Sequence, residues 1–170
     1  MTTIATDLDY KNASIFRLAD HSRVWIYQSN RPFSEREQIV LTSQINGFVQ
    51  SWAAHGRDLL AAGTILFDQF IVLSVDEMQA GASGCSIDTS INFIKEVATQ
   101  YNVSLFDRLV FTFLNHGKVE TATSKAFKQL YTEGVVSKDT LVFDNLVNTI
   151  GDLKSVWLKP LATSWHKRFV

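Results

Sequence analysis

The side chains best suited to chemistry lie between residues 76 and 88. Asp76 and Glu77 follow the apolar run 70–75, and Cys85, the one cysteine of the chain, lies among small residues just before a helical pattern. The positive end of a helix dipole and its free N–H groups stabilise a thiolate. Cys85 is therefore a candidate nucleophile, and the alternative is a buried packing residue, the usual role of a free cysteine.

A cysteine nucleophile needs a base and a group that orients the base. His55 or His116 would be the base and Asp76 would orient it, because each stands at the expected end of a strand or helix. The alternative for both histidines is a solvated turn, since each precedes a glycine. Cys85, His55, His116 and Asp76 together predict a thiol-dependent enzyme.

The loop before this helix could instead hold a small anion. N–H groups at a helix start and serine hydroxyls are anion ligands, although a serine there is equally a helix cap. The candidate ligand-binding residues are Ser83, Gly84, Ser86, Glu77 and Asp88.

Nucleotide and metal motifs are missing from the sequence. An apolar strand ending in Asp76 and Glu77 resembles a Walker B strand, but no G-x-x-x-x-G-K-[ST] run accompanies it. The Gly117-Lys118 pair has Thr112 where the first glycine of that motif would stand. No H-x-x-x-H or H-E-x-x-H spacing occurs. We expect no ATPase activity, no metal site and no cofactor.

Alternating strand and helix patterns position these residues. Strands are predicted at 23–28, 64–68, 70–76 and 107–114, since these runs are rich in β-branched and aromatic residues. Helical spacing predicts helices from Ser34 to about residue 55 and from Cys85 to Tyr101. The order β-α-β-β-α-β over about 23–114 predicts an α+β fold with a ferredoxin-like core.

Beyond residue 114 the pattern is weaker. It predicts an edge strand at 118–122, a short helix around Phe127–Tyr131, a strand at 140–145, and extended segments with a helical turn near Trp165. Trp157 and Trp165 should hold this part against the core. We expect one domain, 1–170, with a C-terminal α/β extension over 115–170.

Composition narrows the partners. The formal net charge of −1 provides no field for nucleic acid, and the longest apolar run is too short to span a membrane. The first residues, 1–12, carry two aspartates and no apolar segment, so they do not form a secretory signal. Because a single cysteine also suits a reducing compartment, we expect a cytoplasmic protein.

Seven runs of the sequence carry a resemblance to known proteins. They are RVWIYQSNR (23–31), SWAAHG (51–56), FIVLSVDE (70–77), ASGCSID (82–88), LFDR (105–108), FDNLVNT (143–149) and SWHKRF (164–169). Together they resemble a small bacterial protein family whose members are often labelled "ABC transporter ATPase". The resemblance implies a stand-alone bacterial protein and, without Walker and signature motifs here, transfers no ATPase chemistry.

The function expected from the sequence is non-catalytic binding of a small ligand, with an anion as one candidate, or of a protein partner. A homodimer is expected by analogy with other ferredoxin-like sheets. The alternative is the thiol-dependent enzyme built on Cys85.

Overall fold

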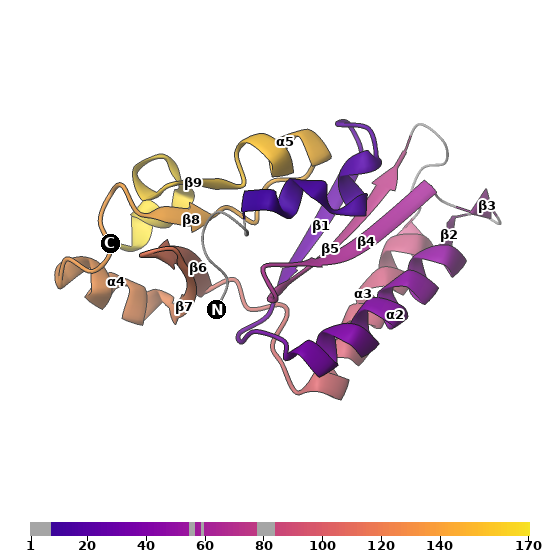
Figure 1. Cartoon of the computed structure of the whole chain (residues 1–170), viewed down its shortest axis with the longest axis horizontal. Coiled ribbons are helices and arrows are strands. Elements are labelled where there is room, and N and C mark those ends of the chain that lie inside the picture. Colours follow the sequence, from indigo (N-terminus) through magenta and orange to yellow (C-terminus); the bar gives the residue numbers. More distant parts are fainter. Residues whose placement is uncertain (1–7, 55–56, 59, 78–83) are drawn as a thin grey trace.

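The computed structural model describes residues 8–54, 57–58, 60–77 and 84–170 of the chain. Its first sheet is antiparallel, with the strand order β1-β5-β4. These strands are β1 (Arg23–Gln28), β4 (Leu60–Leu66) and β5 (Phe70–Asp76). Every residue of β5 is buried, because β5 is the central strand and carries packing on both faces (Figure 1). The predicted hairpin is confirmed, but its first strand spans 60–66 and not 64–68, because residues 67–69 form the β4–β5 turn.

Two long helices cover one face of this sheet. The first, α2 (Glu35–Ser51), begins with the predicted capping box, in which Ser34 and Glu37 each accept the other's backbone N–H. The second, α3 (Gly84–Tyr101), follows β5. Arg31 donates to Glu37 and to the Tyr101 carbonyl, and these bonds to Arg31 hold the pKa of Glu37 down to about 2.

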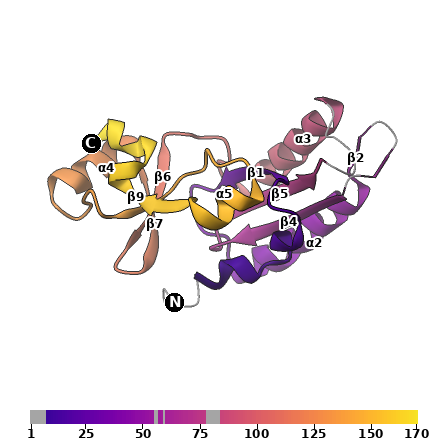
Figure 2. The same ribbon diagram turned by 90° about the horizontal axis from the view of Figure 1, so that it is seen from above.

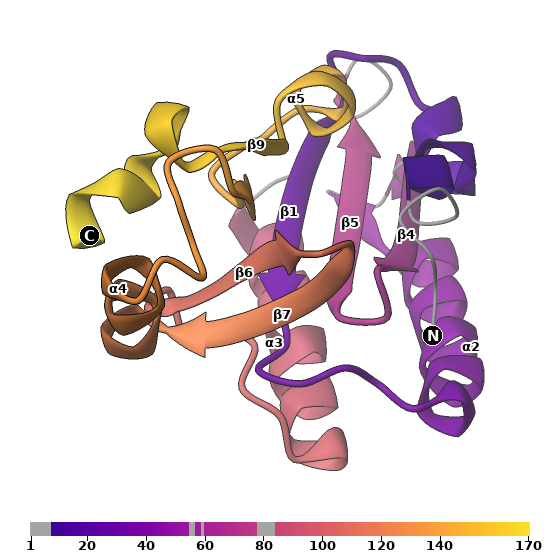
Figure 3. The ribbon, with the colours of Figure 1, turned by 60° about the vertical axis from the view of Figure 1, so that its left-hand side comes forward.

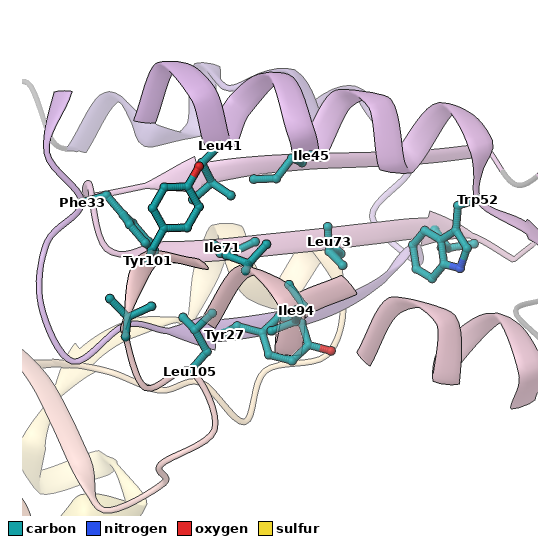
Figure 4. Packing of buried hydrophobic residues seen from close by; sticks show 13 residues of the cluster. Tyr27, Phe33, Leu41, Ile45, Trp52, Ile71, Leu73, Ile94, Tyr101 and Leu105 are labelled. Atoms are coloured by element: carbon teal, nitrogen blue, oxygen red, sulfur yellow. The ribbon is translucent and has the colours of Figure 1, made fainter. Parts of the chain in front are cut away.

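The main core lies between this sheet and the two helices. Leu41 and Ile45 of α2 meet Ile71 and Leu73 of β5, and Trp52 closes one end of the cluster (Figure 4). The Trp52 indole donates to the Ser86 carbonyl at 2.8 Å, which ties the end of α2 to the first turn of α3. A short hairpin of β2 (Ala53–Ala54) and β3 (Arg57–Asp58) follows α2.

A second antiparallel sheet, of order β7-β6-β8-β9, lies at one end of the first (Figures 1 and 3). Its strands are β6 (Val110–Asn115), β7 (Lys118–Thr123), β8 (Leu141–Phe143) and β9 (Leu158–Pro160). The helix α4 (Ser124–Thr132) packs against it through Phe127.

This sheet changes the expected topology. The order β1-β5-β4, with its two helices, matches the first five elements of the predicted β-α-β-β-α-β order. The ferredoxin-like order is nevertheless not confirmed, because β6 pairs with β7 and β8 instead of with β1. The edge of β1 that does not pair with β5 lies beside the segment that precedes the helix Ile150–Ser155. There Arg23 and Thr149 form an antiparallel bridge. The α+β class is confirmed.

The other face of the first sheet is covered from both ends of the chain. The short 3-10 helices η1 (Leu8–Asn12) and η2 (Ser14–Arg17) lie there with α5 (Ile150–Ser155), a helix that the sequence did not predict (Figure 2). Trp157 is fully buried against Phe70 and Phe143, so the expected docking of the C-terminal part is confirmed. The chain closes with η3 (Leu161–Thr163) and η4 (Trp165–Phe169).

Candidate functional site

Asp76 ends β5 as predicted, but its histidine partner is one that the sequence did not suggest. His21 Nε2 lies 2.9 Å from Asp76 Oδ1, and the Asp76 side chain is nearly buried while His21 is half exposed. His21 precedes β1, which pairs with β5 so that Arg23 lies opposite Val75. The pairing register therefore explains the contact.

Glu77 forms a second ion pair at the same end of the sheet. Its Oε1 lies 3.5 Å from Arg23 Nη1, and the Arg23 guanidinium lies 4.7 Å from the centre of the Trp25 ring. Both charged side chains are more than two-fifths exposed, which makes this pair weak in water. Asp76 at the end of β5 and Glu77 after it thus each contact a residue at the start of β1 or just before it.

Cys85 lies where the sequence predicted it, in the first turn of α3, and it is exposed. Gly84 and Asp88 are also exposed, whereas Ser86 is buried. His55 and Ser83 lie outside the described residues. Cys85 and three of the predicted anion-binding residues, Gly84, Ser86 and Asp88, therefore lie in the first turns of α3, whereas Glu77 follows β5.

His116 lies in a different part of the fold. It forms the two-residue β6–β7 turn with Gly117, and both have positive φ, 47° and 78°. The β6–β7 hairpin is joined to the first sheet where Gln69 donates to Thr121, at the start of β5. Asp76 ends β5, about 20 Å further along the strand. The structure does not bring His116 and Asp76 together.

A cavity of about 380 Å³ lies where the two sheets meet. It is lined by the end of β1, the loop that leads into β6, the residues after β8, and η4. Phe106, Leu109 and Leu146 line it although they are 46%, 53% and 61% exposed, so they form an apolar rim. Among its other lining residues are Tyr27, Gln28, Arg108, Asn145, Trp165, His166 and Arg168.

A chain of hydrogen bonds fixes the amide groups of this cavity. Trp157 Nε1 donates to Asn145 Oδ1 at 2.9 Å, and Asn145 Nδ2 donates to Gln28 Oε1 at 3.0 Å. Gln28 Nε2 then donates to the Val110 carbonyl at 2.8 Å. Because the groups come from β1, β6 and the region after β8, the network holds the two sheets in a fixed relation.

His166 is the buried titratable group of the cavity wall. It is 2% exposed, stacks on Trp165 at 4.0 Å and meets the Phe111 ring edge-on at 4.7 Å. Burial lowers the pKa of His166 to about 4, with a smaller contribution from Lys159, and Asp144 opposes the shift. The imidazole is therefore neutral at pH 7.

Ser164 is the hydrogen-bond partner of the His166 ring. His166 Nδ1 lies 2.6 Å from Ser164 Oγ, which also accepts the His166 backbone N–H. Which of the two side chains donates this bond depends on the tautomer of the imidazole. His166 is thus a neutral imidazole of the cavity wall whose Nδ1 has a partner within the protein.

Two arginines give the cavity its positive charge. The side chains of Arg108 and Arg168 are exposed, and neither forms an ion pair with another described residue. Asp107, the acid of the lining, accepts the Leu109 N–H at 2.9 Å. Guanidinium groups without a carboxylate partner are suited to hold an anionic group.

The residues of this cavity were not predicted from the sequence. Its polar residues carry no spacing motif, and the one available signal is the short basic run His166-Lys167-Arg168 after Trp165. His21 was missed because its partner, Asp76, stands far along the chain. Both arrangements depend on strand pairing.

Comparison of the chain with protein-family models, curated proteins and solved structures gave no match. In the described ranges, no helix combines the length and the apolar character needed to cross a membrane. The same ranges contain no group of three or more His, Cys, Asp or Glu side chains placed to hold a metal ion.

Proposed function

We propose that the protein binds a small ligand with an anionic group and an apolar body in the cavity between its two sheets. The observation that carries this proposal is the combination of an apolar rim with the guanidinium groups of Arg108 and Arg168, neither of which forms an ion pair with a residue that the structure describes. The volume of about 380 Å³ is near the lower end of the range for small-molecule sites.

The remaining polar groups of the wall suit binding rather than turnover. Gln28 and Asn145 are fixed by bonds to each other, and His166, whose pKa is lowered to about 4 by burial, is neutral and a weak base at pH 7. Four of the runs that carry the expected family resemblance, at 23–31, 105–108, 143–149 and 164–169, contribute to the lining. That four of these runs meet at the cavity supports the cavity as the binding site. The protein that we propose is a cytoplasmic bacterial one.

The proposal is tested by calorimetry with indole-3-acetate, hexanoate and phenyl phosphate, and with indole-3-acetamide as the uncharged match of the first. At least one anion should bind, and the amide should bind at least about tenfold more weakly, since a charge-assisted hydrogen bond is worth about 1.5–3 kcal/mol. Arg168→Gln and Arg108→Gln should each reduce binding of the anion by a similar factor.

Arg36→Gln is the matched control, because Arg36 is an exposed arginine of α2 outside the cavity lining. It should leave binding unchanged. Equal binding of the acid and the amide, or equal loss in the Arg36 and Arg168 variants, would refute the assignment of the anion to this cavity.

The second candidate is the thiol-dependent enzyme, favoured by the exposure of Cys85 in the first turn of α3. A thiolate nucleophile should react with iodoacetamide at neutral pH much faster than a cysteine peptide does. A native Cys85 that reacts no faster than the peptide would exclude this candidate.

A further inference from the structure

We propose that β4 is the pairing edge of a homodimer, in which the first sheets of two copies join into one. This inference is independent of the cavity. It rests on a difference between β4 and the other sheet edges of the described chain.

A sheet edge offers unpaired N–H and C=O groups, and proteins protect such edges with charges, proline or a covering segment. The second sheet is protected on both sides: β7 carries Lys118 and Glu120, and β9 carries Lys159 and Pro160. On the first sheet, the β1 edge is covered by the segment at Thr149.

The edge strand β4 has no such protection. Its seven residues, Leu-Ala-Ala-Gly-Thr-Ile-Leu, include neither a charged residue nor a proline. Within the described ranges its ladder has one partner, β5, and η2 contacts β4 on the face of the sheet away from α2. Because the strand carries no charge, antiparallel pairing with a second copy opposes no like charges in any register.

The flank of α2 that lies beside β4 also carries few charged residues. A methyl group placed on Gly63 would lie 2.5 Å from Ile45 and 3.3 Å from Val49, so these two side chains of α2 face β4. On the side toward α3, Gln44 bonds Gln100 and Phe48 stacks on Phe93.

Successive helix residues are about 100° apart, which places a further set of side chains on the flank of α2 away from α3. Ile39 is in this set and is 74% exposed. The flank residues are Glu35, Gln38, Ile39, Thr42 and Asn46. Only Glu35 is charged, and it begins the helix, so two antiparallel copies would keep these glutamates apart.

The size of this surface predicts a modest affinity. β4 is about 23 Å long, and a sheet layer with one helix layer is about 20 Å deep, so the two copies together would bury on the order of 1,000 Å². That area is near the lower limit for a specific interface. The dimer should therefore dissociate on dilution.

Sedimentation of the full chain from about 1 µM to about 1 mM, the range in which interfaces of this size dissociate, tests the proposal. The wild-type protein should pass from monomer to dimer. Ile39→Glu should weaken the dimer at least about tenfold, because it would bury an unpaired charge between the copies. Hydrogen exchange of the 60–66 amides should slow at high concentration.

Val40→Glu is the matched control, since Val40 is 50% exposed on the same helix but points away from the β4 flank. It should change the dissociation constant by less than about twofold. A wild-type monomer at about 1 mM, equal effects of the two variants, or exchange of 60–66 that ignores concentration would each overturn the proposal.

Discussion

Protonation of His166 should make the folded protein less stable in mild acid. The unfolded chain binds this proton with the ordinary pKa of 6.5, whereas burial lowers the pKa in the folded protein to about 4. Between these values the unfolded state binds more protons, so stability falls as the pH falls. The contribution is fully present above pH 6.5 and fully lost below pH 4.

The size of the loss follows from the two pKa values. One pKa unit corresponds to about 1.4 kcal/mol, so His166 should cost about 2 kcal/mol at pH 5 and about 3 kcal/mol at pH 4, relative to pH 7.5. For a domain whose unfolding free energy is about 5–15 kcal/mol, this is a large fraction. Glu37, with its pKa lowered to about 2, contributes in the more acidic range between 4.5 and 2.

Urea denaturation at a series of pH values, followed by tryptophan fluorescence, measures this loss in the wild type and in His166→Gln. The variant has no group that titrates at this position, so the difference in stability between the two proteins should shrink by about 2 kcal/mol from pH 7.5 to pH 5. Lys167→Gln, an exposed neighbour in η4, is the control for disturbance of the helix.

The measured quantity is the change of the unfolding free energy with pH. A loss of packing in His166→Gln that is the same at every pH therefore does not affect it. If that variant does not fold, an NMR titration of His166 in the wild type gives its pKa directly. Parallel pH profiles of the wild type and His166→Gln, or a measured pKa of 6.5 or above, would show that the burial argument is wrong.

Four further substitutions test packing and helix capping by urea denaturation. Gly63→Ala should destabilise the protein by about 1–3 kcal/mol, because its methyl group would lie 2.5 Å from Ile45 Cγ2. Gly47→Ala, whose methyl group would have no atom within 4 Å, should instead stabilise α2 by up to about 1 kcal/mol. A change of the same sign in both variants would contradict this reasoning. Trp157→Ala should cost about 3–5 kcal/mol, since Trp157 is fully buried, and a loss below about 1 kcal/mol would be inconsistent with its place in the core. Ser34→Ala should cost about 1 kcal/mol through the lost capping bond, and an unchanged midpoint would argue against the cap.

Local sequence patterns were sufficient for the elements of the first layer. β1 and β5 have the predicted bounds, α2 begins at the predicted capping box, and α3 begins at the predicted loop. These elements depend on side-chain periodicity and on hydrogen bonds between near neighbours, which a sequence displays directly. The site residues at 76, 77 and 85 were placed at the ends of elements for the same reason.

The short elements near the C-terminus were less well predicted. α5 has six residues, and its cap at Thr149 was not recognised among segments expected to be extended. A helix of that length depends on tertiary packing more than on its own propensity. Its buried residues, Ile150 and Leu153, pack in the cluster around Trp157.

Tertiary structure decided which sheet β6 joins, and with it the position of the candidate site. A strand pattern specifies that β6 pairs but not with which partner, because strand pairing is a contact between distant residues. That choice placed a second sheet beside the first and formed the cavity from residues 28, 108, 145 and 166. The sequence by itself determined the candidate groups at the end of β5 and at the start of α3. The pairing of strands decided that Asp76 meets His21 and that a buried neutral histidine shares a cavity with two arginines that form no ion pair among the described residues.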